Sequence, residues 1–121
     1  MLQDKQPPPE AYGPPAVVLD AKGVTAWLGG EAHSRILWSQ IALVEIGIVG
    51  ATALDYAEAF WRLAGEGVEF IAPVEVIVNA DQLRDRLFLL PGFDMETYRR
   101  AREAEAQGEL REFICWRKGN A

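Results

Sequence analysis

Leu89-Leu90-Pro91-Gly92-Phe93-Asp94 decides the fold of this chain, because it separates two segments with helical spacing. Proline followed by glycine ends a helix, and the aspartate is a preferred cap for the next one. The segments before this hinge have the apolar spacing of strands, and one more such segment follows the second helix. The predicted order is therefore strands, helix, hinge, helix and a final strand.

The helix before the hinge is predicted to begin near Asn79. Asn79 is a capping residue, and Gln82 follows three positions later, at the spacing of a capping box. Leu83, Leu87 and Leu90 then recur at spacings of four and three. This spacing predicts one apolar stripe that packs on a sheet.

The helix after the hinge is predicted over Met95 to Gln107, with Asp94 as its cap and Gly108 as its stop. Its large apolar side chains after the first turn are limited to one tyrosine, so we expect it to lie on the surface. The expected anchors are Tyr98, Ala101 and the hinge residue Phe93.

Short apolar segments in the first half of the chain predict a run of strands. Residues 16–19 and 24–28 flank the turn Asp20-Ala21-Lys22-Gly23 and should form a hairpin. Residues 36–38 and 41–49 are the next predicted strands, with a bend between them.

Residues 57–63 fit two structures. Their aromatic and leucine spacing suits a helix, but Gly65-Glu66-Gly67 offers a hairpin turn into the alternating segment 68–71, which favours a strand. Pro73 then places that segment at an edge or a strand end.

The last predicted strand spans residues 111–118. Phe113 and Cys115 fall on one face, whereas Ile114 and Trp116 fall on the other. Because both faces are apolar, we expect this strand to be covered on both sides.

The chain has 121 residues, half of them hydrophobic, which suits a single domain with one core. Five of its seven prolines lie in the first 15 residues. We therefore expect a disordered proline-rich tail at 1–15, one globular domain at 16–118 and a short tail at 119–121. The predicted fold class is α+β, with six to seven mainly antiparallel strands and two helices before the last strand.

Charge and cysteine content limit the possible partners. The net charge of −6 argues against nucleic acid, which requires a basic stripe, and no apolar run reaches the roughly 18 residues of a membrane span. The single cysteine, Cys115, favours a cytoplasmic location. Residues 1–78 carry ten acidic and four basic side chains, so this strand region could meet a basic partner, although ordinary solubility charge is the simpler explanation of the excess.

The residues that could carry chemistry have simpler interpretations. His33 lies in a predicted turn, and Ser34 beside it should point the other way in a strand, so we do not expect them to pair. Cys115 is interpreted as a small buried hydrophobe, and no His or Cys spacing matches a metal site. We predict no enzyme activity, no cofactor and no metal. Ion pairing along the second helix explains the cluster of Arg99, Arg100 and Arg102.

The chain carries five short motifs and one isolated proline, Pro73. The motifs are Leu19-Asp20-x-x-Gly23-Val24, Ile36-x-Trp38-x-x-Ile41-x-x-Val44, Phe60-Trp61-x-Leu63, Leu90-Pro91-Gly92-Phe93-Asp94 and Phe113-x-x-Trp116. In these motifs residues 16–118 resemble a family of small uncharacterised bacterial proteins. The core segments also resemble a PH-like barrel, which implies strands that close partly around one core. Two helices before the last strand, in place of one at the end, depart from that plan. The resemblance implies no activity.

These observations favour a protein-binding module that is not an enzyme. Its specific version is an immunity-type inhibitor that presents Glu45, Glu58 and Glu69 to a basic toxin. The alternative is a carrier of a small apolar ligand. All four tryptophans fall in predicted strands, and core filling is their default role, but the carrier hypothesis places three of them around a cavity: Trp27, Trp38 and Trp61.

Overall fold

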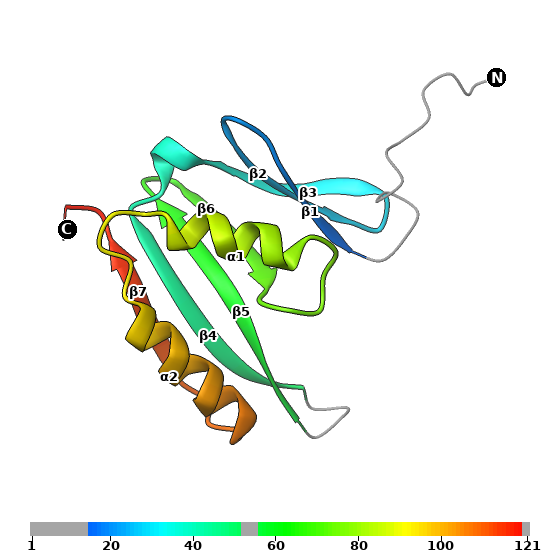
Figure 1. The fold of residues 1–121 in the computed structure, drawn as a ribbon. Helices are drawn as coiled ribbons and strands as arrows, with labels where there is room; N and C mark the ends of the chain where they lie inside the picture. The colour runs from blue at the N-terminus through cyan, green and yellow to red at the C-terminus, as the bar shows by residue number, and fades with distance from the viewer. Residues whose placement is uncertain (1–14, 52–55, 120–121) are drawn as a thin grey trace.

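The computed structural model describes residues 15–51 and 56–119, which fold into two sheets and two α-helices (Figure 1). The prediction of a tail at 1–15 therefore falls, except for Pro15, outside the described residues. In chain order the elements are β1 (Ala16–Leu19), β2 (Gly23–Leu28), β3 (Glu31–Leu37), the 3-10 helix η2 (Trp38–Gln40), β4 (Leu43–Ala51), β5 (Tyr56–Gly65), β6 (Val68–Pro73), α1 (Ala80–Phe88), α2 (Met95–Ala106) and β7 (Glu112–Arg117).

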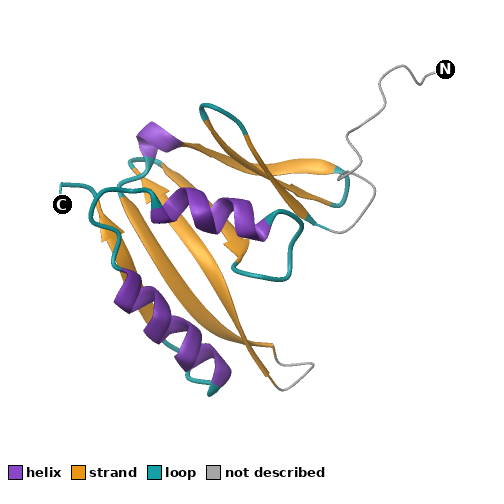
Figure 2. Ribbon diagram, viewed as in Figure 1, coloured by secondary structure: helices purple, strands orange, loops and turns teal. Residues whose placement is uncertain are grey.

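Both sheets are antiparallel throughout their strand pairs. The smaller sheet has the order β1-β2-β3, and the larger has the order β6-β5-β4-β7. Strand β3 lies beside β6, so the sheets adjoin without closing into a barrel (Figure 2). The predicted α+β class, with a mainly antiparallel sheet and two helices before the last strand, is confirmed. The PH-like resemblance stays an expectation.

The first hairpin forms where the turn residues predict it. The Asp20 carboxylate accepts hydrogen bonds from the backbone N–H groups of Lys22 and Gly23, at 2.8 and 2.9 Å, and closes the turn between β1 and β2. It also pairs with Arg35 of β3 at 3.0 Å. One carboxylate therefore holds the turn and ties it to the third strand.

The segment that fitted both a helix and a strand is a strand. Residues 56–65 form β5, which pairs with β4 along its whole length and with β6 over its second half. At its end, a Cβ on Gly65 would stand 2.0 Å from the carbonyl oxygen of Gln40, so glycine allows η2 to pass against this strand. Long-range pairing on both edges outweighs the local helical spacing.

Helix α2 packs on β4, β5 and β7 of the four-stranded sheet, whereas α1 contacts β1 of the smaller sheet and reaches the aromatic groups of α2 and the hinge through Phe88 (Figures 1 and 2). Trp61 of β5 is fully buried beneath them. Its ring stacks on Tyr98 with centroids 5.9 Å apart and meets Phe93 edge-on at 6.4 Å. Ala101 is also fully buried. The predicted anchors of the second helix are therefore confirmed.

The hinge is held from both of its sides. Gly92 has a φ of 83°, which favours glycine, and Asp94 caps α2 by accepting from the Thr97 N–H at 3.0 Å. Opposite the hinge, β7 contains a bulge that leaves Cys115 without a partner on β4. The free Cys115 carbonyl accepts from the Asp94 N–H at 2.8 Å, and the Trp116 indole donates to the Pro91 carbonyl at 2.7 Å.

Three local predictions are wrong. Asn79 precedes α1 in a left-handed conformation, with a φ of 70°, and its side chain does not cap the helix: its amide donates to the Val17 carbonyl at 3.0 Å and so ties α1 to β1. Trp38 begins η2 and is not in a strand, and its indole donates to the Asp20 carbonyl at 3.0 Å. Strand β7 is not covered on both sides, since Ile114 is 40% exposed.

Candidate binding face

The side of the larger sheet that faces away from the helices carries a continuous set of polar and apolar side chains. Residues that are directly paired on neighbouring strands point to the same side of a sheet. The pairs are Glu45 with Arg62 and Ile114, Gly47 with Phe60 and Glu112, Val49 with Glu58, and Arg62 with Ile71. Glu69 of β6 and Arg117 of β7 point to the same side, because they pair with Ala64 and Leu43, each two residues from a member of this set. We call this side the open sheet face.

Apolar groups on this face are unusually exposed for strand residues. Val49 is 51% exposed, Ile71 is 49% exposed and Ile114 is 40% exposed, whereas Ile46 and Trp61 on the helix-covered side are fully buried. Apolar surface that remains open on an otherwise packed sheet is typical of an interaction site.

The predicted glutamates share this face. Glu45 and Glu69 both bind the Arg62 guanidinium, at 2.8 and 2.5 Å, and Glu58 lies further along β5 opposite Val49. The hydrogen bonds that Arg62 donates to Glu69 and Glu45 raise the pKa of Arg62 above its ordinary value. The structure therefore brings Glu45, Glu58 and Glu69 onto one surface and adds Arg62, which sequence reasoning missed.

Charge on the described part of the open sheet face is negative. Its carboxylates are Glu45, Glu58, Glu69 and Glu112. They are opposed by Arg62 at the centre and by Arg117 at the end of β7, opposite Leu43. The excess is two negative charges, although two carboxylates are already engaged by Arg62.

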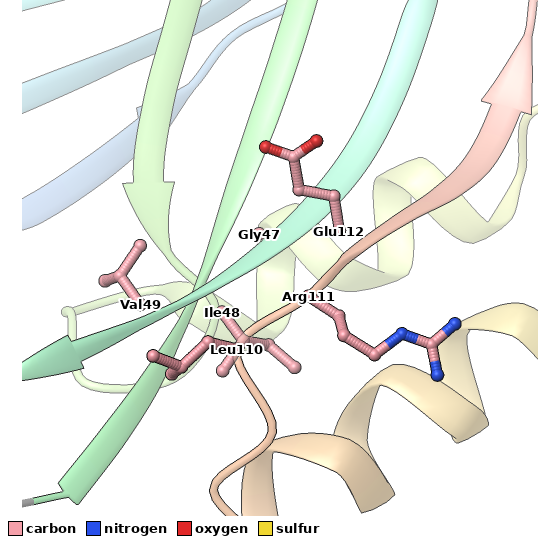
Figure 3. A pocket seen from close by; sticks show the side chains of 6 residues that line it. All are labelled: Gly47, Ile48, Val49, Leu110, Arg111 and Glu112. Atoms are coloured by element: carbon pink, nitrogen blue, oxygen red, sulfur yellow. The ribbon is translucent and has the colours of Figure 1, made fainter.

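A shallow hollow of about 520 Å³ extends the face at the start of β7 (Figure 3). A Cβ on Gly47 would meet no atom within 4 Å, so this glycine leaves open space above β4. In Figure 3 the Glu112 side chain lies over β4 near Gly47, whereas Arg111 points away towards α2. Val49 and the exposed Leu110 form the apolar border of the hollow.

The three predicted pocket tryptophans lie in three different settings. Trp61 is in the core against Tyr98, Trp38 lies under the Arg86 guanidinium at 4.4 Å from its ring centroid, and Trp27 is half-buried in β2. The carrier hypothesis that depends on these rings stays a prediction.

A second concave site lies at the junction of the two sheets, which we call the junction groove. It has a volume of about 440 Å³, and apolar groups form most of its surface, among them Leu28, Phe60, Ile71 and Ile77. The polar side chains that line it are His33, Ser34 and Glu69.

His33 and Ser34 both line this groove because β3 contains a bulge. Ala26 pairs with Ser34 and Trp27 pairs with Ala32, so His33 has no partner on β2. The prediction that His33 lies in a turn is wrong, since His33 lies within β3 at this bulge. Within residues 15–51 and 56–119, no hydrogen bond links His33, Ser34 and Glu69. Gly29 and Gly30 form the turn before β3 with positive φ angles, but they do not predict a bulge at His33.

Other candidate residues have structural roles. Cys115 is buried, and burial, together with the charges of Asp94 and Glu45, raises the pKa of its thiol to about 12. A thiol with that pKa is not a nucleophile at neutral pH. The predicted ion pairing along the second helix is confirmed for Arg99, which binds Glu96 and Glu103, and for Arg102, which binds Glu105 and also Glu75 outside the helix. Arg100 instead donates a hydrogen bond to the Thr97 hydroxyl at 3.4 Å.

Comparisons of the chain with protein families, with curated proteins and with solved structures give no match. No helix in the described part of the chain is long and apolar enough to cross a membrane. The described residues also contain no group of three or more His, Cys, Asp and Glu side chains placed to hold a metal ion. The open sheet face and the junction groove both combine exposed apolar groups with carboxylates.

Proposed function

We propose that this domain is a protein-binding module, not an enzyme, and that it presents the open sheet face to a basic protein. One observation carries the proposal: exposed Val49, Ile71 and Ile114 lie among four carboxylates on the side of the sheet that the helices leave uncovered. The specific version is an immunity-type inhibitor that covers a basic toxin.

The two kinds of side chain have different roles in such an interface. Burial of the three apolar side chains contributes about 25 cal/mol for each Å² removed from water. The carboxylates steer a positively charged partner towards the face and reject acidic proteins. On this face the Glu45–Arg62 pair lies between Ile71 and Ile114 in one row across the four strands, so apolar contacts would flank a charged centre.

Arg62 prepares the carboxylates for binding. It holds Glu45, whose side chain is only 12% exposed, and Glu69, which is 49% exposed, so both are already oriented when a partner arrives. Orientation before binding lowers the entropy that association costs. A partner guanidinium or ammonium would then share these carboxylates with Arg62.

The experiment uses a displayed library of random peptides, selected on the purified full chain, followed by synthesis of the enriched sequences. The proposal expects enriched peptides to be basic. The triple variant Glu45→Gln, Glu58→Gln, Glu69→Gln should bind these peptides about tenfold or more weakly at low salt, because it removes the charges that attract them. A tenfold loss corresponds to about 1.4 kcal/mol.

The matched control is Glu96→Gln, Glu103→Gln, Glu109→Gln, which removes the same formal charge from the helix side of the molecule. This control should bind as tightly as the unmodified chain. Equal losses in both triple variants would show that net charge, and not the open sheet face, attracts the peptides, and the proposal would be wrong.

A second candidate function, the small apolar-ligand carrier, is favoured by the junction groove, whose volume falls in the range of small-molecule sites. The carrier expects saturable binding of an uncharged apolar dye, such as Nile red, with one dye bound per chain. It also expects the peptide selection to enrich no basic sequence. These outcomes separate the two functions.

A further inference from the structure

We infer that the junction groove is the anchor site of the same interface and takes one bulky apolar side chain of the basic partner, next to a lysine or arginine of that partner. This inference rests on the proposed function and specifies the chemistry of the partner.

The groove is continuous with the open sheet face. Phe60, Glu69 and Ile71 belong to both sites. Each of them lines the groove, and by the strand pairing each also points to the open face of β5 and β6. A partner that covers Ile71 therefore also reaches the groove. Tight interfaces concentrate their binding energy in a few bulky anchors seated in such pockets.

The groove has room for a large side chain because small residues form part of its lining. Ala26 and Ala72, only 1% and 2% exposed, line it from β2 and β6. The volume of about 440 Å³ is bordered mainly by carbon atoms, so a charged side chain would lose its hydration there and would find a compensating carboxylate only at Glu69. The occupant is therefore apolar.

The polar groups that line the groove indicate which partner residue lies next to the apolar anchor. Glu69 accepts the Arg62 Nε–H through one carboxylate oxygen, and among the described residues its second oxygen accepts no hydrogen bond. That oxygen suits a lysine or arginine adjacent to the anchor. The bulge presents His33 and Ser34, whose side chains can hydrogen-bond the backbone of the segment that carries the anchor.

The test compares two synthetic peptides, taken from the selection described above, that differ only by replacement of the bulky apolar residue with alanine. Both are equally basic. The unmodified chain should bind the anchor peptide about tenfold or more tightly than its alanine version, the size of effect typical of an anchor residue.

The variant Ser34→Phe fills the groove and should remove this preference, while the residual binding of both peptides stays equal. The matched control is Ser39→Phe, the same substitution on an exposed residue of η2 that does not line the groove. It should keep the preference. Ile71→Ala, at a residue already half exposed, removes one wall of the groove and should reduce the preference without filling the site.

Failure of this inference differs from failure of the proposed function. If basic peptides bind through the three glutamates but the apolar residue is not preferred, or if Ser34→Phe and Ile71→Ala leave the preference intact, the anchor site is wrong and the open sheet face stands. If the face variant and its helix-side control bind equally, the proposed function is wrong, and the anchor site fails with it.

Discussion

Arg62 shows at the scale of one residue what sequence reasoning found and what it missed. The acidic side chains Glu45, Glu58 and Glu69 were identifiable because they interrupt apolar strands. The arginine between two of them was not, since Glu45 and Glu69 lie 17 and 7 positions from it along the chain. Only the register of three strands brings these groups together, and register depends on long-range pairing.

The Asp20 carboxylate should make folding stability sensitive to acid. The hydrogen bond that it accepts from Arg35, and then those from the Lys22 and Gly23 N–H groups, lower the pKa of Asp20 from 3.8 to about 2. A carboxylate with a lowered pKa in the folded state stabilises that state above its unfolded pKa, and this contribution disappears as the pH falls from about 4 to about 2.

We therefore expect Asp20→Asn to be less stable than the unmodified chain at neutral pH and to lose less stability between pH 4 and pH 2. Urea unfolding followed across that interval measures both effects. If the free energy of unfolding of Asp20→Asn fell between pH 4 and pH 2 as steeply as that of the unmodified chain, Asp20 would not be the source of the acid sensitivity.

At the scale of elements, local chemistry predicted the hinge and long-range contacts decided the rest. Proline, glycine and aspartate act within their own segment, so the end of α1 and the cap of α2 could be read from residues 89–94. Asn79 is a residue type that often caps helices, but its side-chain amide donates to the Val17 carbonyl instead. The bulges at His33 and Cys115 have no reliable local signal, and they determine which side chains line the groove and which carbonyl holds the hinge.

The hinge glycine provides a direct test at this scale. Gly92→Ala forces a side chain into a left-handed conformation, which costs about 1–2 kcal/mol, and should lower the free energy of unfolding by that amount. Chemical denaturation measures the change.

Gly47→Ala is the matched control. Its added Cβ meets no atom within 4 Å, so it should be neutral or stabilising by up to about 1 kcal/mol. Equal destabilisation by the two substitutions would show that the conformation of Gly92 is not what the hinge requires.

For the whole molecule, the sequence predicted the α+β class, the two helices and their place before the last strand, because these depend on periodicity and breakers. It did not predict that the strands divide into two adjoining sheets, nor that the helices leave one face of the larger sheet open. The partner hypothesis rested on charge alone, whereas the structure shows exposed apolar groups among those charges.

The claim that the open sheet face is the binding surface is tested most directly by methyl NMR of the chain during titration with an enriched basic peptide. The account predicts the largest shifts at Ile71, Ile114 and Val49, with small shifts at the buried Ile46 and at Leu89, which is 74% exposed beside the hinge. Shifts concentrated at Leu89 and Met95, with Ile71 and Ile114 unchanged, would place the peptide beside the helices and contradict it.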